Sequence, residues 1–197
     1  MDELALAFRD VLAPMTPSDE TIAHFSSTPW AVSYFTDPEY RPIRNFSRTP
    51  RPAPSTEQTF FARTLNTPTT MQAWQIFYRP SISPSTRPDE ILTLVKLGTD
   101  LNGFSDNSAQ GGFVAALLDE VIGLACQAQV RSKVFTLTAT LKVNYKRPVK
   151  TPGVVLVRSW VHKEEGKKQW GRGTVEDGMG NVLSEGEALY IKTKPRL

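Results

Sequence analysis

The chain has 197 residues and a mass of 22.0 kDa, which is long enough for one domain with a well-buried core but not for two. Hydrophobic residues make up 40% of the chain and charged residues 22%, as in ordinary soluble globular proteins. The net charge of +3 is small and the basic residues are spread along the chain, which gives weak support for an anionic ligand and none for a nucleic-acid partner.

The first ten residues contain three acids, which argues against both a secretory signal and an acid-poor transit peptide. No stretch of the sequence approaches the roughly 18 consecutive apolar residues that a membrane span needs. The single cysteine, Cys126, excludes an intramolecular disulfide and is compatible with a reducing compartment. We therefore expect a cytoplasmic protein without a membrane partner.

Composition divides the chain near residue 90. All 12 glycines lie at or after Gly98, whereas 12 of the 15 prolines lie at or before Pro88. The first part is therefore punctuated by proline, and the second depends on glycine for turns and close backbone approaches. We predict an N-terminal helical and proline-rich extension over residues 1–70 and a main domain over residues 71–197.

The extension contains short predicted helices and one long proline-rich segment. Residues 2–12 fit an amphipathic helix, and a second helix is expected within residues 16–25, with Pro17 near its first turn. Residues 36–59 hold five prolines. Because proline restricts φ and removes an N–H donor, this segment is predicted to be an extended arm or linker rather than sheet. Residues 60–65 are expected to form a helical turn.

The main domain opens with two predicted strands, over residues 73–78 and 91–97, where aromatic and branched side chains are concentrated. A polar loop over residues 100–109 then leads to an apolar helix over residues 113–129. Apolar side chains cover nearly the whole circumference of this helix. A helix that is apolar on every side is a buried one.

Four further strands are predicted, over residues 134–145, 154–162, 169–176 and 182–191. In the first of these strands apolar and polar residues alternate strictly, with the period of two that is typical of a strand. Its apolar face is expected to hold Phe135, Leu137, Ala139, Leu141, Val143 and Tyr145. Short turns join the last three strands. One strand, one buried helix and a four-stranded antiparallel meander predict an α+β fold in which a sheet wraps around a single helix.

The clearest chemical signal lies at the start of the predicted helix, in Gln110-Gly111-Gly112. Glycines there let a ligand approach the backbone, and the free N–H groups of a helix start favour negative charge on an oxygen, such as a carbonyl becoming an oxyanion. Eight residues after Gly111, Asp119 places a carboxylate in the middle of the apolar helix. Such a group should be hydrogen-bonded, raised in pKa, or facing a cavity.

These features also have purely structural interpretations. An isolated Gly-Gly pair is more often a turn than an oxyanion site, and an acidic pair on a helix, here Asp119 and Glu120, is usually solvated. The helix offers almost no polar face for these carboxylates, so neither structural interpretation fits the sequence well. From the residues alone, a structural and a functional role for Asp119 are about equally supported.

The segment from Gly111 to Glu120, followed by Thr138 and by Asn144-Tyr-Lys-Arg-Pro148, resembles the hotdog-fold thioesterase superfamily. The similar branch contains thioesterase superfamily member 4 and the PaaI-like proteins, and the resemblance covers roughly residues 91–192. It implies a hotdog fold, in which an antiparallel sheet wraps around one long helix. It also implies a homodimer or a dimer of dimers, in which edge strands pair across the two-fold axis.

The resemblance assigns roles to individual residues. Gly111 corresponds to the oxyanion donor, and Asp119 corresponds to the general base or nucleophile, which the partner subunit supplies to each site. Thr138 corresponds to a residue on the following strand that assists water. Gln110 stands where the family has histidine, and it can orient a carbonyl or a water but cannot titrate near neutral pH.

Further substrate contacts are expected at Gly112, Phe104, Asn107, Lys146 and Arg147. The loop before the helix shapes the acyl pocket in the family, and here it is about one residue longer, so the acyl group cannot be transferred from the family. The basic residues at the strand end could hold the phosphates of coenzyme A or of a carrier-protein phosphopantetheine. A solvated basic turn is the structural alternative.

The remaining reactive residues do not form a second site in the sequence. His24 and His162 are the only histidines and are expected to be structural, and no metal cluster or Ser-His-Asp arrangement is indicated. Cys126 shares the helix face of Asp119 and is expected to be a packed small residue rather than part of the pocket. No cofactor is expected beyond the coenzyme A or phosphopantetheine carried by a substrate.

Three functions remain open from the sequence. The first is hydrolysis of an acyl thioester, with Gly111 and Asp119 acting on the carbonyl and the water. The second keeps the fold and uses the same acid for dehydration, isomerisation or cyclisation of a polyketide-like intermediate. The third is a non-catalytic binding protein, because a fold by itself does not settle a function.

Overall fold

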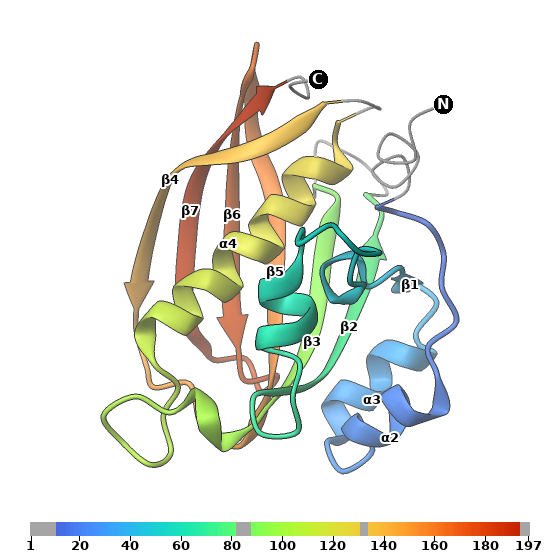
Figure 1. Ribbon diagram of the computed structural model, residues 1–197, viewed down its shortest axis with the longest axis vertical. Coiled ribbons are helices and arrows are strands. Elements are labelled where there is room, and N and C mark those ends of the chain that lie inside the picture. The colour runs from blue at the N-terminus through green and yellow to red at the C-terminus, as the bar shows by residue number, and fades with distance from the viewer. Residues whose placement is uncertain (1–10, 82–87, 131–133, 194–197) are drawn as a thin grey trace.

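The computed structural model describes residues 11–81, 88–130 and 134–193. In these residues a seven-stranded, fully antiparallel sheet curves around one long helix, in the strand order β1-β2-β3-β5-β6-β7-β4 (Figure 1). The strands are β1 (Arg41–Ile43), β2 (Met71–Arg79), β3 (Glu90–Leu97), β4 (Phe135–Tyr145), β5 (Gly153–Glu165), β6 (Lys168–Glu176) and β7 (Val182–Thr193). The helices are α2 (Asp19–Phe25), α3 (Pro29–Thr36) and α4 (Gly111–Ala128), with shorter helical turns η2 (Phe46–Arg48), η3 (Phe60–Thr64) and η4 (Thr99–Leu101). The predicted sheet around a single helix is confirmed.

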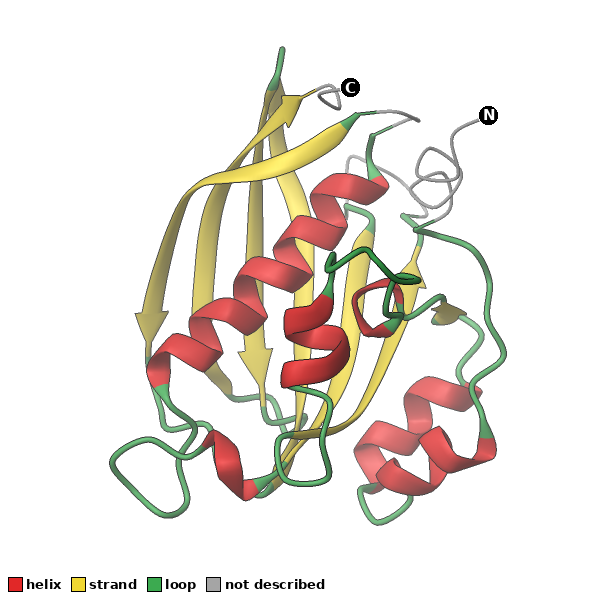
Figure 2. Cartoon of the chain, in the orientation of Figure 1, coloured by secondary structure: helices red, strands yellow, loops and turns green. Residues whose placement is uncertain are grey.

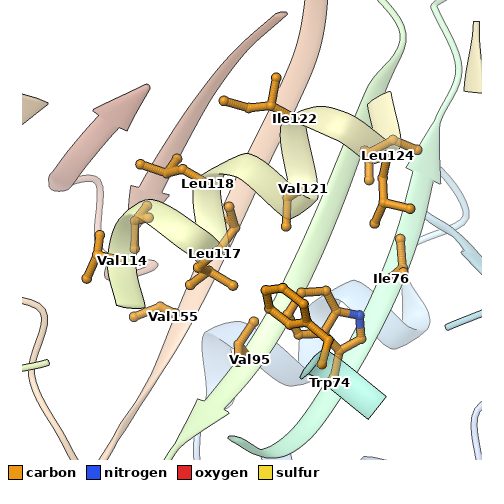
Figure 3. Packing of buried hydrophobic residues seen from close by; sticks show 14 of the residues in the cluster. Trp74, Ile76, Val95, Val114, Leu117, Leu118, Val121, Ile122, Leu124 and Val155 are labelled. Atoms are coloured by element: carbon orange, nitrogen blue, oxygen red, sulfur yellow. The ribbon is translucent and has the colours of Figure 1, made fainter. Parts of the chain in front are cut away.

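Helix α4 crosses the inner face of the sheet diagonally and contributes more buried residues to the main core than any other element (Figures 1 and 3). Nine of its 18 residues are buried, and they pack against Trp74 and Ile76 of β2, Val95 of β3 and Val155 of β5. By length and composition α4 could cross a membrane, but its buried half packs inside this fold, as expected of a core helix.

Glycines on β6 and β7 let α4 approach the sheet closely. A Cβ atom at Gly171 would lie 2.4 Å from Cγ2 of Ile122 and 3.2 Å from Sγ of Cys126. At Gly173 it would lie 2.9 Å from Cγ1 of Ile122. Ile122 is fully buried, so it has no free space into which it could move. The glycines predicted to serve close backbone approach therefore do so beneath the core helix.

Helices α2 and α3 cover the opposite face of the sheet, where they form a second core cluster (Figure 2). Phe25 and Ala31 pack there against Ala73, Phe77 and residues of β3 and β5; the full buried set is Phe25, Ala31, Ala73, Phe77, Leu92, Leu94 and Leu156. Because β3 is covered on both faces, seven of its eight residues are buried, and its apolar run is nearly continuous.

The N-terminal extension is part of the same packed unit as the main domain. Val11, Ile43, Phe46 and Phe61 belong to the main core cluster together with residues of α4. The predicted helix within residues 16–25 is confirmed as α2, although its N-cap is Ser18 and its first residue is Asp19. The predicted helix over residues 2–12 lies almost entirely outside the described residues.

One prediction for the extension is wrong. Residues 36–59 were expected to avoid the sheet, but they contain both the end of α3 and the strand β1, which pairs with β2 through Pro42 and Phe77. Proline is tolerated because β1 lies at the edge of the sheet, where a missing N–H breaks no central ladder. The predicted helical turn over residues 60–65 is confirmed as η3.

The expected four-stranded meander is also wrong. Of the four strands of the expected meander, only β5, β6 and β7 are neighbours in chain order, whereas β4 pairs with β7 at the far edge of the sheet. Strand β5 pairs instead with β3. Strand β3 therefore links β2 to the three neighbouring strands β5, β6 and β7. Alternation along a strand reveals which side chains share a face, but it does not reveal which strand becomes the neighbour.

A bulge in β4 overturns the strict alternation predicted for that strand. The register with β7 shifts between Thr138 and Thr140, so Ala139 is an extra residue. Thr138 therefore faces α4 before the bulge, and Leu141 and Val143 face α4 after it. Leu137, which was expected on the apolar face, is 61% exposed. The bulge places a hydroxyl rather than an apolar side chain next to the helix.

The close contact between Gly171 and Ile122 yields a prediction. Gly171→Ala should lower the free energy of unfolding by about 1–3 kcal/mol, because the added methyl overlaps Cγ2 of a side chain that cannot move. The measurement is chemical denaturation. In an Ile122→Ala background the same substitution should cost clearly less, since the clashing group is absent; equal costs in both backgrounds would contradict the assignment.

Candidate active site along the core helix

The start of α4 is built by Gln110, which is its N-cap. The side-chain Oε1 of Gln110 accepts a hydrogen bond from the backbone N–H of Phe113 at 2.8 Å. Its side chain therefore satisfies one free donor of the first turn. Among the described residues, no acceptor is found for the backbone N–H groups of Gly111 and Gly112. Two donors at the positive end of the helix dipole thus remain available to a ligand.

A cleft of about 330 Å³ lies beside Gly111. The hydroxyl of Tyr145 donates a hydrogen bond to the carbonyl oxygen of Gly111 at 2.9 Å, which holds the first helical residue in place. Lys146 and Arg147 line the same cleft, so the structure brings three predicted site residues together. Lys146 pairs with Glu185 at 2.6 Å, and Arg147 donates to Asn181 at 2.6 Å, and all four of these side chains lie at the surface.

Asp119 lies at a second cleft, of about 170 Å³, on the exposed side of α4. Its Oδ1 accepts hydrogen bonds from the hydroxyl of Thr138 at 2.9 Å and from the hydroxyl of Tyr190 at 2.8 Å. We call this space the carboxylate cleft; Gln58, Glu120, Gln127 and Thr136 also line it. The structure therefore joins Asp119 and Thr138, as expected, and adds Tyr190.

Tyr190 reaches the helix because Gly123 leaves room for it. A Cβ atom at Gly123 would lie 3.1 Å from the Tyr190 hydroxyl oxygen. This contact explains why α4 tolerates a glycine in its interior, which disfavours a helix by about 1 kcal/mol. Burial, followed by the nearby charge of Asp119, raises the pKa of Tyr190 well above its ordinary value. Its hydroxyl therefore remains a hydrogen-bond donor to Asp119.

Glu120 is the functional candidate that sequence reasoning missed. Its Oε1 accepts a hydrogen bond from the hydroxyl of Ser47, a fully buried residue of η2 in the N-terminal extension. Burial raises the pKa of Glu120 above its ordinary value, and the charge of Asp119 raises it further. The sequence signal was the Asp119-Glu120 pair on an apolar helix, but nothing in the proline-rich segment pointed to Ser47.

The two clefts are separate within one chain. Gly111 and Asp119 are eight residues apart on α4, which corresponds to about 12 Å of helix, and their clefts have no lining residue in common. Phe104 and Asn107 lie on the exposed loop before the helix and line neither cleft. One chain therefore presents two half sites, one at the start of α4 and one at its middle.

The other reactive residues stay away from these clefts. Cys126 is fully buried, and burial raises the pKa of its thiol to about 12, so the expected packing role is confirmed. His24 lies in the last turn of α2, and His162 lies on β5. Within residues 11–81, 88–130 and 134–193, no group of three or more His, Cys, Asp or Glu residues could hold a metal ion.

The raised pKa of Glu120 predicts a pH dependence of stability. The folded pKa lies above the ordinary value of 4.5, so the folded state binds this proton more tightly, and wild-type stability falls as pH rises from 4.5 to the folded pKa. Glu120→Gln has no charge to desolvate. Its melting temperature relative to wild type should therefore be higher at pH 8 than at pH 4.5; a pH-independent difference would contradict the burial of this acid.

Part of the chain is similar in sequence to known proteins. Residues 107–183 match the model of the thioesterase superfamily. The chain is 30% identical over 106 residues to the Acyl-coenzyme A thioesterase THEM4 of Rattus norvegicus, a match that covers 53% of this chain. The chain spans only 44% of that relative's length.

Solved structures share the fold at low identity. The putative thioesterase yhdA from Lactococcus lactis gives a TM-score of 0.54 at 15% identity, covering 64% of this chain and 94% of that one. A hypothetical thioesterase protein with coenzyme A from Streptococcus pneumoniae gives a TM-score of 0.51 at 14% identity, covering 66% and 95%. The expected resemblance is therefore confirmed: the chain contains an α+β hotdog fold and is similar in sequence to the thioesterase superfamily and to the THEM4 thioesterases.

Proposed function

We propose that the protein hydrolyses acyl thioesters of coenzyme A in a site that two copies of the chain complete. The observation that carries this proposal is the carboxylate cleft, in which Thr138 and Tyr190 both donate to Oδ1 of Asp119. The Thr138 hydroxyl and the Tyr190 hydroxyl, which also lies 2.5 Å from the carbonyl oxygen of Asp119, orient the carboxylate. In the described part of the chain no partner is found for its second oxygen, where we place the attacking water. A carboxylate positioned in this way can act as a general base.

In the proposed reaction, Asp119 takes a proton from a water molecule as that water attacks the thioester carbonyl. The N–H of Gly111, at the positive end of α4, stabilises the negative charge that develops on the carbonyl oxygen. When the intermediate collapses, the carbon–sulfur bond breaks and the proton passes from Asp119 to the leaving thiolate. Gln110 contributes by fixing the first turn through its bond to Phe113.

Coenzyme A is proposed to bind at the cleft beside Gly111. Lys146 and Arg147 line this cleft and lie near the surface, where they can exchange their present partners for phosphate oxygens. The pneumococcal protein of the same fold was solved with coenzyme A. A phosphopantetheine on a carrier protein would offer similar chemistry and is the alternative substrate. A cytoplasmic location, where coenzyme A thioesters are made and used, remains part of the proposal.

A homodimer, or a dimer of dimers, would bring the two half sites together. The surface of α4 that faces away from the sheet holds small or polar residues, including Gly112, Ala115, Ala116 and Asp119, and none of them is fully buried. Strand β4 is an open edge with Leu137 and Tyr145 exposed. A second copy covering this face would place Gly111 of one chain near Asp119 of the other.

A second function is favoured by the carboxylates of the site. Among the described residues no histidine lines either cleft, and the acids there are Asp119 and Glu120. Paired acids can also move protons within a substrate, as in dehydration, isomerisation or cyclisation of a polyketide-like thioester. Absence of thiol release with every acyl-coenzyme A tested would favour that chemistry or a non-catalytic binding protein.

Asp119→Asn should separate catalysis from folding. Because Asn can accept the same hydrogen bonds from Thr138 and Tyr190, the melting temperature should be unchanged or raised. Turnover should fall by roughly two orders of magnitude or more, the usual scale for losing a general base. Thiol release from a panel of acyl-coenzyme A esters measures turnover. A variant that melts several degrees lower but retains turnover per folded molecule would show that the carboxylate is structural.

Gly111→Pro tests the shared site. Proline is compatible with the first helical position and with the extended backbone of Gln110 (φ −63°, ψ 134°), yet it removes the N–H that would donate to the oxyanion. The variant should fold and be inactive. After subunit exchange with Asp119→Asn, half of the dimers carry one intact site, so about a quarter of wild-type activity should return. No recovery despite verified exchange would mean that both residues act within one chain.

A further inference from the structure

A third cleft adjoins the carboxylate cleft and is larger than it. It has a volume of about 550 Å³ and is lined by residues 56–61 of the extension together with Glu120 and Phe135. We call it the extension cleft. Glu120 and Gln58 line both clefts, so the two spaces meet at these side chains. Beyond this junction the extension cleft has aromatic walls, formed by Phe60, Phe61 and Phe135.

Glu120 has a free hydrogen-bonding atom at this junction. One carboxyl oxygen accepts from Ser47, and no partner for the other is found in the part of the chain that the structure describes. Burial raises the pKa of Glu120, which favours the neutral carboxyl group and leaves it able to donate one hydrogen bond. Because Glu120 lines both clefts, this oxygen can be reached by a ligand that occupies them.

The extension that faces Glu120 is firmly held. Arg48, next to Ser47, donates to the carbonyl oxygens of Phe61, Leu65 and Met71 at 2.9–3.2 Å. Burial lowers the pKa of Arg48 to about 10, and it still fastens η2 to η3. These bonds keep Ser47 and the start of η3 against α4.

Gln58 has a backbone conformation that side chains rarely adopt. Its φ of 62° is the only positive value among non-glycine residues in the described ranges. The carbonyl of Gln58 accepts from the N–H of Ala62, which begins the turn of η3. Strained residues persist where the surroundings hold them, and they are concentrated at ligand sites. Here the strain directs an amide side chain to the junction of the two clefts.

We propose that Glu120, together with Gln58, determines acyl specificity by hydrogen-bonding an oxygen on the acyl chain of the substrate, so that oxygenated acyl thioesters are bound in preference to plain hydrocarbon ones. The inference rests on the proposed function, in that the thioester carbonyl lies at Asp119 and the acyl chain passes the junction toward the extension cleft. A hydrocarbon chain there would remove water from the Glu120 carboxyl and the Gln58 amide without replacing its hydrogen bonds, which is unfavourable.

The experiment compares ligands that differ by one oxygen. Calorimetric titration of the Asp119→Asn protein, which should not turn the ligands over, is carried out with butyryl-, 3-hydroxybutyryl- and 4-hydroxybutyryl-coenzyme A and with coenzyme A alone. At least one hydroxybutyryl ester should bind about tenfold more tightly than butyryl-coenzyme A, the scale of one hydrogen bond. Glu120→Leu in the same background should abolish this difference, and Glu120→Gln, which keeps a donor and an acceptor, should retain most of it.

One control variant and one replacement variant make the result specific. Glu165→Gln changes an exposed acid in the hairpin between β5 and β6 and should leave the preference unchanged. If Glu120→Leu fails to fold, Gln58→Leu serves as the second variant, and it should reduce the preference. Equal affinities for all butyryl esters in Asp119→Asn, or a preference that survives Glu120→Leu or, in its place, Gln58→Leu, would overturn the proposal.

Thiol release by the protein with Asp119 intact separates this proposal from the proposed function. Binding preference without release on any ester refutes hydrolysis but leaves the acyl contact standing. Release without any preference for oxygenated esters refutes the acyl contact alone. Absence of both binding and release refutes both.

Discussion

Helix α4 is the element on which the rest of the structure depends, because most of its surface must be removed from water. Nine buried side chains pack on the inner face of the sheet, and burying each large apolar side chain contributes roughly 1.5–3 kcal/mol before the entropy of ordering is subtracted. The sheet curves to cover the helix, and glycines on β6 and β7 lie where Ile122 presses against it. The position of the helix in turn limits where polar chemistry can occur, since only its narrow outer face is free of the sheet.

That outer face carries two adjacent carboxylates with different surroundings. Asp119 receives hydrogen bonds from two hydroxyl groups, those of Thr138 and Tyr190. Glu120 lies deeper, with one donor from Ser47, and burial raises its pKa. The two neighbouring acids therefore contact different parts of the chain, Asp119 the sheet and Glu120 the N-terminal extension.

The N-terminal extension takes part in both the core and the site. Phe46 and Phe61 join the main core cluster, while Ser47 and Gln58 reach the acids of α4. The buried Arg48 links these segments by donating to three backbone carbonyls. A curved sheet with one helix leaves one side of that helix open, and in this chain the extension covers part of it. The chemistry near Glu120 is thus shaped by residues that lie outside the matched segment 107–183.

The sequence by itself determined the strands β2, β3, β5, β6 and β7 and the core helix, and it singled out Gly111 and Asp119 as candidate site residues. These features rest on local signals, namely alternation, apolar periodicity and an acid at a fixed distance from a helix start. The bulge at Ala139, the pairing of β4 with β7, the edge strand around Pro42 and the contact between Ser47 and Glu120 were decided only by the tertiary structure. Each depends on which segments meet in space, and contacts between residues as distant as Ser47 and Glu120 leave no periodic pattern in either segment.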